Sequence, residues 1–468
     1  MIISSDSQIR AQRAFSYNPQ DSVVMEPGQT QLDSVQLGAA AKPDLNTDKF
    51  KLVGGLAPNS EGQFVFPQTE PGFHRANAFA SVVKTLADFE KAYGQPVQWA
   101  TGNQRLSLSA DGGEMLNAYY SRRDGGLFFF HSTDPVNGKV VYGADSGEVS
   151  SHECGHAILD AVRPKYMGSW SPDPGAFHES FGDVIALFRS LQEPAVVDKV
   201  LAQTAGDLSK PNMAAALGEE MGIIINHTSG KNSTGGDYTR NALNDFVWQD
   251  PSTLPKNAPP DQLSREPHSF SRVWTGAVYD ILEALVKDRL AQPNPPDIKT
   301  ALRESAVEGM ELYGRLMRKA PKAGFAFRQM ANAFVQSDLE LNGGRRAGMI
   351  REALEGRQLL AADTREIERV PEGSQMAEVV LQGDRFGAFA GAKVQEETSG
   401  DAPLDFREAG NQLSERMADL IQDGEILLTQ PGQQLSLRNL IKPDGEPYSG
   451  YVSWDNQEKR IVRNTIVS

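Results

Sequence analysis

Apolar residues recur at helical spacing in several long segments of the chain. Between Ala78 and Tyr93 they return about every 3.6 residues, and Gly94 follows at the expected helix end. The same spacing predicts helices over residues 274–290, 297–317, 325–341 and 347–359. Short runs rich in β-branched and aromatic residues predict strands at 97–99, 105–109, 117–120 and 127–131. Together these elements predict an α+β fold.

The two ends of the chain differ in composition from its middle. Residues 1–74 are polar and rich in Gln, Ser, Pro and Gly, which predicts an extended N-terminal arm with little regular structure. Phe50 and Phe64 are among the apolar residues that could dock this arm. Residues 361–468 contain scattered strand-like runs and predict a small mixed or β-rich C-terminal module. Between the two ends we expect an N-terminal lobe at 75–190 and a mainly α-helical lobe at 191–360.

One predicted helix carries a metal-binding pattern. The segment 147–162 looks helical and contains His152-Glu153-x-x-His156. Residues four apart lie on one face of a helix, so both imidazoles can bind one metal ion while Glu153 lies beside it as a base for a water molecule. A pattern this short also occurs by chance on a solvated helix. The next predicted helix favours the metal site, because Glu179 and Asp183 are again four residues apart.

In these residues the chain resembles the thermolysin-like metallopeptidases of the gluzincin class. The resemblance covers about residues 75–360 and implies a two-lobed fold, with zinc helices in a mixed N-terminal lobe and a mainly helical C-terminal lobe. It implies Zn²⁺ as the cofactor, with His152, His156 and Glu179 as ligands. Glu153 would be the general base, and Asp183 would orient a ligating histidine from outside the ligand shell.

Further positions match the family around the substrate. Asn117-Ala118 corresponds to a sheet edge that pairs with the substrate backbone, although an ordinary edge strand would have the same sequence. Arg240 and His268 are 28 positions apart, similar to two residues that line the family's substrate site. His268 would stabilise the oxyanion, and Glu266 is the nearest carboxylate where the family has an orienting aspartate.

Two other features of the family are only partly present. Tyr166 is the best match to its substrate-polarising tyrosine, in a connecting loop slightly longer than usual. Glu148 corresponds to a calcium-binding acid, but Ser190 stands where another acidic ligand would be. The family's double calcium site is therefore not expected, and some other calcium site stays open.

Composition and charge restrict the classes of molecule that this protein could bind and the compartment in which it could work. A net charge of −15 argues against nucleic acid and anionic membranes, and no apolar run approaches the length of a transmembrane helix. The single cysteine, Cys154, allows no intrachain disulfide, and its position in the motif favours a packing role. No secretory signal is visible, so we expect a cytoplasmic protein or one exported by a non-classical route. The oligomeric state is not predicted.

The sequence therefore predicts a zinc endopeptidase acting on a protein or peptide, and two alternatives remain. An aminopeptidase of the same class would carry Gly-x-Met-Glu-Asn, which the residues Gly112-Gly113-Glu114-Met115-Leu116 do not match. A zinc-stabilised binding protein would not need Glu153, and its metal would usually have four protein ligands.

Overall fold

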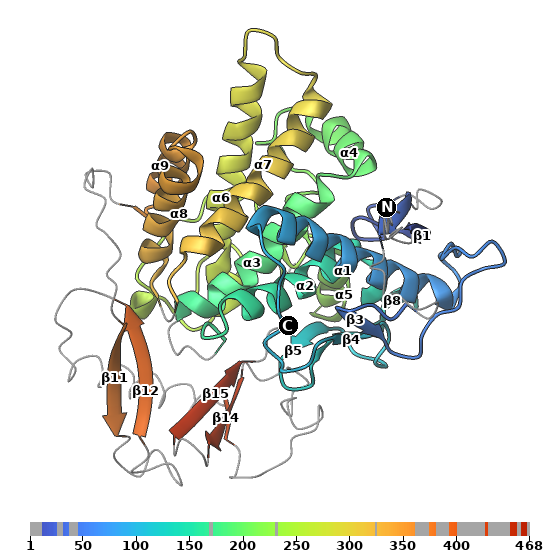
Figure 1. Ribbon diagram of the computed structural model, residues 1–468, viewed down its shortest axis with the longest axis horizontal. Helices are drawn as coiled ribbons and strands as arrows, with labels where there is room; N and C mark the ends of the chain where they lie inside the picture. The colour runs from blue at the N-terminus through green and yellow to red at the C-terminus, as the bar shows by residue number, and fades with distance from the viewer. Residues whose placement is uncertain are drawn as a thin grey trace, which may run out of the picture.

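The computed structural model describes residues 12–25, 31–36, 45–167, 172–229, 233–322 and 325–360, together with the backbones of five later strands. The fold is mixed α+β, as the sequence predicts. Helices α2 (Gly147–Val162) and α3 (Pro172–Ser190) lie at its centre, with α1 (Pro71–Tyr93) beside them (Figure 1). None of the helices in the described segments is long and apolar enough to cross a membrane.

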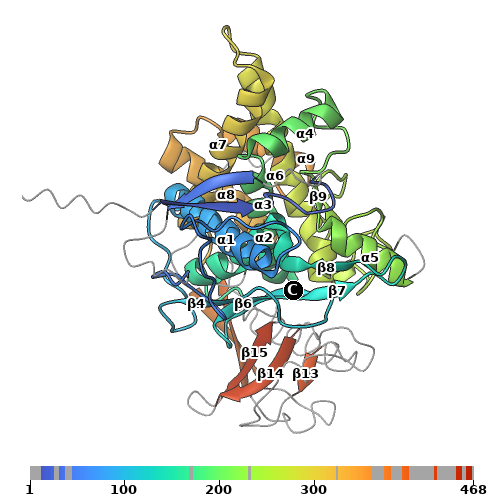
Figure 2. The ribbon, with the colours of Figure 1, turned by 90° about the vertical axis from the view of Figure 1, so that its right-hand side faces the viewer.

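A small sheet covers one side of α1 and α2. Its strands are β3 (Phe50–Leu52), β4 (Leu106–Ser109), β6 (Gly126–Phe129) and β5 (Ala118–Ser121), in that order. The β3–β4 and β4–β6 pairs are parallel, and β5 is antiparallel to β6 with Ala118 opposite Phe129. β7 (His131–Thr133) pairs with β8 (Val140–Tyr142), and a short 3₁₀ turn at Gly143–Asp145 leads into α2 (Figure 2). β5 is therefore an edge strand that lies against α2.

The helical half packs against the other side of α3. It consists of α6 (Pro267–Leu290), α7 (Ile298–Lys319), α8 (Phe327–Asn342) and α9 (Ala347–Gly356), close to the predicted segments. An aromatic cluster joins it to α3, with Phe177 5.4 Å from Trp274 and Phe181 5.3 Å from Tyr313 between ring centroids. The burial of these large rings holds α3 between the two halves.

The segment between the two halves contains more structure than the sequence indicated. It contains α4 (Pro194–Thr204) and α5 (Glu219–Ser229). β9 (Ala216–Leu217) pairs with β10 (Arg240–Asn241), and a 3₁₀ turn at Pro251–Thr253 precedes α6. The pairing of β9 and β10 brings Arg240 towards the centre of the molecule.

The N-terminal arm differs from its prediction. β1 (Gln12–Tyr17) pairs with β2 (Gln31–Gln36), so this part has regular structure. Phe15 is fully buried, with ring centroids 4.9 Å from Phe64 and 6.0 Å from Phe79. Phe50 and Phe64, which were expected to dock the arm, are buried, whereas the contact of Phe15 with Phe79 of α1 was not predicted. The predicted strand at 97–99 is also wrong, since these residues follow α1 as an irregular segment.

The C-terminal module is described only as strand backbones. β11 (Ser374–Val380) pairs with β12 (Lys393–Ser399). β14 (Gly450–Asp455) pairs with β13 (Ile426–Leu428) and β15 (Arg460–Thr465). β11, β13, β14 and β15 agree with strand-like runs in the sequence, whereas β12 was not predicted. The remaining predictions for residues 361–468 lie outside the described residues.

Candidate metal centre

The first two candidate ligands come from the middle of α2. Ser146 caps this helix by accepting a hydrogen bond from the Val149 amide at 3.1 Å. His152 and His156 follow one turn apart on one face, with ring centroids 4.5 Å apart and ring planes nearly perpendicular. Both side chains are buried, so they do not belong to the solvated helix face that was the alternative interpretation of the motif.

The third candidate ligand, Glu179, comes from α3. Its Oε2 is 3.6 Å from His152 Nε2, and its Oε1 is 3.7 Å from His156 Nε2. One ligand atom from each of the three residues lies within 4.8 Å of the others. Among the described residues, neither imidazole Nε2 has a hydrogen-bond partner, although buried polar atoms are normally satisfied. The three side chains therefore fit around a metal ion.

The charge of Glu179 suits that role. Burial alone raises the pKa of its carboxyl group, but His268 and His156 hold it below the ordinary value. The carboxylate is therefore ionised. Two imidazoles and one carboxylate leave the fourth position of a tetrahedral zinc site open, as in catalytic zinc sites. The geometry does not select zinc over other metals that bind imidazole.

Asp183 contacts the His152 ring on the side away from Glu179, and Arg240 in turn holds Asp183. His152 Nδ1 is 2.9 Å from Asp183 Oδ1, which leaves Nε2 to face Glu179. Arg240 donates two hydrogen bonds to Asp183, from Nη2 at 2.7 Å and from Nε at 3.0 Å. Burial opposes ionisation of Asp183, but Arg240 and His152 outweigh it and lower the pKa. The predicted place of Asp183 thus fits the structure. Arg240 lies beside the ligand cluster, with Nη2 3.8 Å from Glu179 Oε2, and nothing in the structure tests its predicted contact with a substrate.

Glu153 lies on α2 between the two histidines. Its side chain is only 2 % exposed, and its Oε2 lacks a hydrogen-bond partner among the described residues. Burial raises the pKa of Glu153 to about 7, and the neighbouring Glu179 adds to this effect while His152 opposes it. A carboxylate with a pKa near neutrality is well suited to accept and return a proton.

His268 lies on the other side of Glu179. Glu266 caps α6 by accepting a hydrogen bond from the Ser269 amide at 2.8 Å, and its other oxygen lies 2.5 Å from His268 Nδ1. His268 Nε2 is 3.3 Å from Glu179 Oε2. The Nε2 side of the ring therefore points at the ligand cluster, and Glu266 lies at Nδ1, in the orienting position that the sequence indicated.

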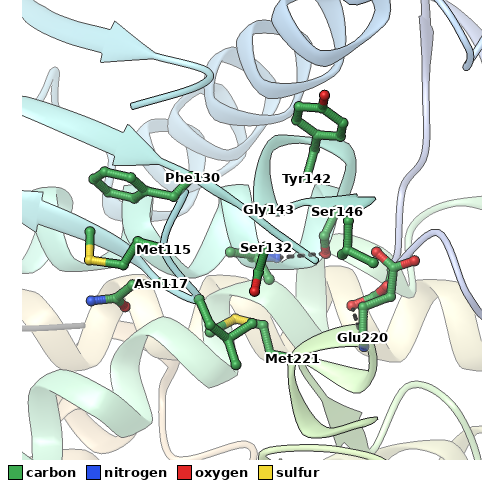
Figure 3. Close-up of a pocket in the computed structure, with 13 residues that line it drawn as sticks. Met115, Asn117, Phe130, Ser132, Tyr142, Gly143, Ser146, Glu220 and Met221 are labelled. Carbon is green, nitrogen blue, oxygen red and sulfur yellow. Dashed lines mark hydrogen bonds between the residues drawn. The ribbon is translucent and has the colours of Figure 1, made fainter. Parts of the chain in front are cut away.

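Asn117 lies at the start of edge strand β5 and lines a pocket. Figure 3 shows Asn117, Met115 and Phe130 on one side of this pocket and Met221 and Glu220 on another. Val149 of α2 contributes to the same lining, which is mainly apolar. Ala118 is buried in β5 opposite Phe129. The two residues are therefore at an edge, as predicted, but nothing in the structure tests whether a peptide pairs with it.

Tyr166 is not brought to the ligand cluster. It is fully buried, its hydroxyl donates to the Pro321 carbonyl at 2.5 Å, and its ring packs 4.7 Å from that of Phe325. After α2 ends, the chain turns through a hydrogen bond from the Tyr166 amide to the Arg163 carbonyl, which directs this side chain into the aromatic core. We therefore do not assign Tyr166 a role in catalysis.

Cys154 is buried, with Sγ 3.6 Å from the Val82 carbonyl, which agrees with a packing role.

The two helices that carry the candidate ligands cross at a pair of glycines, whose role was not predicted from the sequence. A Cβ atom on Gly155 would lie 2.9 Å from Gly182 Cα, and one on Gly182 would lie 2.6 Å from His152 Nδ1. Only glycine allows α2 and α3 to approach so closely. The sequence contains a signal, since Gly155 and Gly182 both lie inside apolar helical segments, where glycine normally costs stability.

We expect Gly182→Ala to weaken metal binding by displacing the His152 ring, and overpacking of this kind typically costs about 1–3 kcal/mol of stability. Metal titration and thermal unfolding measure the two effects. Gly175→Ala on the same helix is the control, because its Cβ would meet Pro267 at an ordinary 3.5 Å. Equal metal affinity in both variants would show that the crossing does not position His152.

A second group of buried acids was also missed. Asp21 of the arm, Glu148 of α2 and Glu219 of α5 each place a carboxylate oxygen within 4.8 Å of the others. From the sequence, Glu148 alone was a candidate, because the other two residues are distant in the chain.

Compared with models of known protein families the chain matches none, and no curated protein is significantly similar to it in sequence. Its function must therefore be inferred from the geometry of the site.

Proposed function

We propose that this protein is a zinc-dependent endopeptidase. The observation that carries the proposal is the buried cluster of His152, His156 and Glu179, whose ligand atoms face one another beside a buried glutamate. These three residues would hold the ion. When bound, zinc supplies a Lewis acid that polarises the scissile carbonyl and makes a water molecule more acidic.

The remaining steps belong to the protein's own side chains. Glu153 accepts a proton from the attacking water and returns it to the leaving amine, which its raised pKa favours. His268, held at Nδ1 by Glu266, directs Nε2 towards the negative charge that develops on the former carbonyl oxygen. Asn117 and the edge of β5 would align the substrate backbone through β-strand addition.

Cleavage within a chain is favoured over removal of its first residue. An aminopeptidase needs a carboxylate in the site for the free amine of its substrate. In the stretch 112–116 the single carboxylate is Glu114, which is exposed at the surface. A non-catalytic binding protein would gain nothing from Glu153, a buried acid whose Oε2 lacks a partner among the described residues.

The test uses casein and a short peptide blocked by acetylation at its N-terminus. We expect both to be cut, activity to disappear when a chelator removes the metal, and stoichiometric Zn²⁺ to restore it. The same peptide with a free N-terminus tests the aminopeptidase alternative. Hydrolysis of the free peptide alone would favour that alternative, and zinc binding without hydrolysis of any substrate would favour the binding protein.

A further inference from the structure

One buried acid near the end of α2 has no part in the mechanism described above. Asp160 follows His156 by four residues, so it lies on the same side of the helix. Its side chain is fully buried, and α2 ends two residues later at Val162, where the helix dipole is negative. Burial and the dipole both disfavour a negative charge at this position. A carboxylate kept there needs specific partners.

The partners of Asp160 come from the edge strand of the small sheet. The Tyr120 hydroxyl donates to Asp160 Oδ2 at 2.7 Å, and Arg122 Nε donates to the same oxygen at 2.8 Å. Arg122 Nη2 also donates to the other oxygen, Oδ1. The same nitrogen lies 2.5 Å from the carbonyl oxygen of Pro164, just beyond the end of α2. Arg122 therefore holds the carboxylate through both of its oxygens, a geometry that fixes direction as well as distance.

These contacts join two parts of the candidate site. Asn117 and β5 supply the edge that would meet the substrate, and that edge is unpaired in the part of the chain that the structure describes. α2 supplies Glu153 and two of the candidate metal ligands. The backbone of Tyr120 also hydrogen-bonds to the Glu153 side chain. The cluster of Tyr120, Arg122 and Asp160 therefore determines where the edge strand lies along the helix.

The type of contact indicates positioning more than stability. The desolvation of two charges offsets much of the attraction within a buried ion pair, so such a pair is weak evidence for stabilisation. A bidentate pair does restrict both the separation and the orientation of the elements that it joins. Misplacing a reacting group by about 1 Å can cost about 100-fold in rate, so the alignment of β5 with α2 matters for catalysis.

We propose that Arg122 and Asp160, together with Tyr120, are positioning residues. They hold the edge of β5 in register with the candidate metal ligands, so that a polypeptide paired with this edge presents a peptide bond to the metal. The inference rests on the proposed function and narrows its substrate class to extended segments long enough to pair with the strand. Long unfolded chains should therefore be cut more efficiently than very short peptides.

The experiment compares zinc-loaded variants on casein and on the shortest acetylated peptide that wild type cuts. For Arg122→Gln, kcat/KM on casein should fall by up to about 100-fold, whereas the short peptide should lose much less. Arg122→Lys keeps the charge without the bidentate geometry and should recover part of the loss. Arg123→Gln makes the same change at the next residue, which is exposed, and should behave as wild type. A loss of folded protein alone would lower both activities equally, so the ratio of the two activities separates positioning from stability.

Asp160→Asn is the second variant in case Arg122→Gln does not fold. It leaves no buried charge unpaired, because the Arg122 side chain is 36 % exposed and can be hydrated, and it should change the activity ratio in the same direction. Casein affinity is also measured without turnover, in zinc-loaded Glu153→Gln protein with and without Arg122→Gln, which should weaken binding. If wild type cuts no substrate, the proposed function fails, and this binding measurement still decides the inference. Equal losses on both substrates, or casein binding that Arg122→Gln leaves unchanged, would overturn it.

Discussion

Glu153→Gln is expected to abolish peptide hydrolysis while the protein keeps its full zinc content. Glutamine has nearly the same shape as glutamate, and Glu153 is not among the three metal-facing residues, so the ligand cluster should stay intact. The amide cannot accept the proton of the attacking water. General acid–base groups typically contribute roughly 10²–10⁴-fold to rate, and we expect a loss of kcat within that range or beyond it.

The measurement is casein and blocked-peptide hydrolysis on samples whose zinc has been determined. Glu114→Gln is the matched control. It makes the same change at an exposed carboxylate that has no part in the proposed mechanism. It should retain wild-type activity. If Glu153→Gln with a full complement of zinc still cut at the wild-type rate, Glu153 would not be the base and the proposed mechanism would be wrong.

The second large effect is expected for Asp183→Asn. Asp183 is 1 % exposed, holds His152 Nδ1 at 2.9 Å and accepts two hydrogen bonds from Arg240. Residues in this position behind a metal-ligating histidine typically contribute about 10–100-fold to metal affinity, so zinc binding should weaken by that factor. The change also leaves the largely buried Arg240 without its main counter-charge, with only the more distant Glu179 carboxylate at 3.8 Å. Breaking a buried ion pair by removing one partner typically costs up to about 3–5 kcal/mol of stability.

Zinc competition titrations and denaturant unfolding separate these two effects. Adding Arg240→Gln to Asp183→Asn should recover much of the stability, because the unpaired buried charge is removed, but it should not recover metal affinity. This comparison is a double-mutant cycle on a contacting pair. Undiminished zinc affinity in Asp183→Asn would mean that the contact with His152 Nδ1 does not orient the ligand.

Within each helix, the sequence was sufficient to predict the candidate ligands. The spacing of His152 and His156, and of Glu179 and Asp183, places each pair on one helical face because the helical period is close to four residues. The α+β character and the positions of α6 to α9 follow from the same local periodicity, although α6 begins at Pro267, seven residues before its predicted start at Trp274. These features depend on neighbours a few residues away, which is why composition and spacing determine them.

Tertiary structure alone decided how the helices meet and which distant residues join them. Gly155 and Gly182 allow α2 and α3 to touch, and the pairing of β9 with β10 brings Arg240 to Asp183. The turn after α2 buries Tyr166, and the docking of the arm brings Asp21 to Glu148. Each of these contacts depends on packing between segments far apart in the chain. Local sequence patterns do not encode such distances. The candidate ligands, with Asp183 and Glu266 beside them, could therefore be predicted, whereas the contact of Arg240 with Asp183 and the burial of Tyr166 could not.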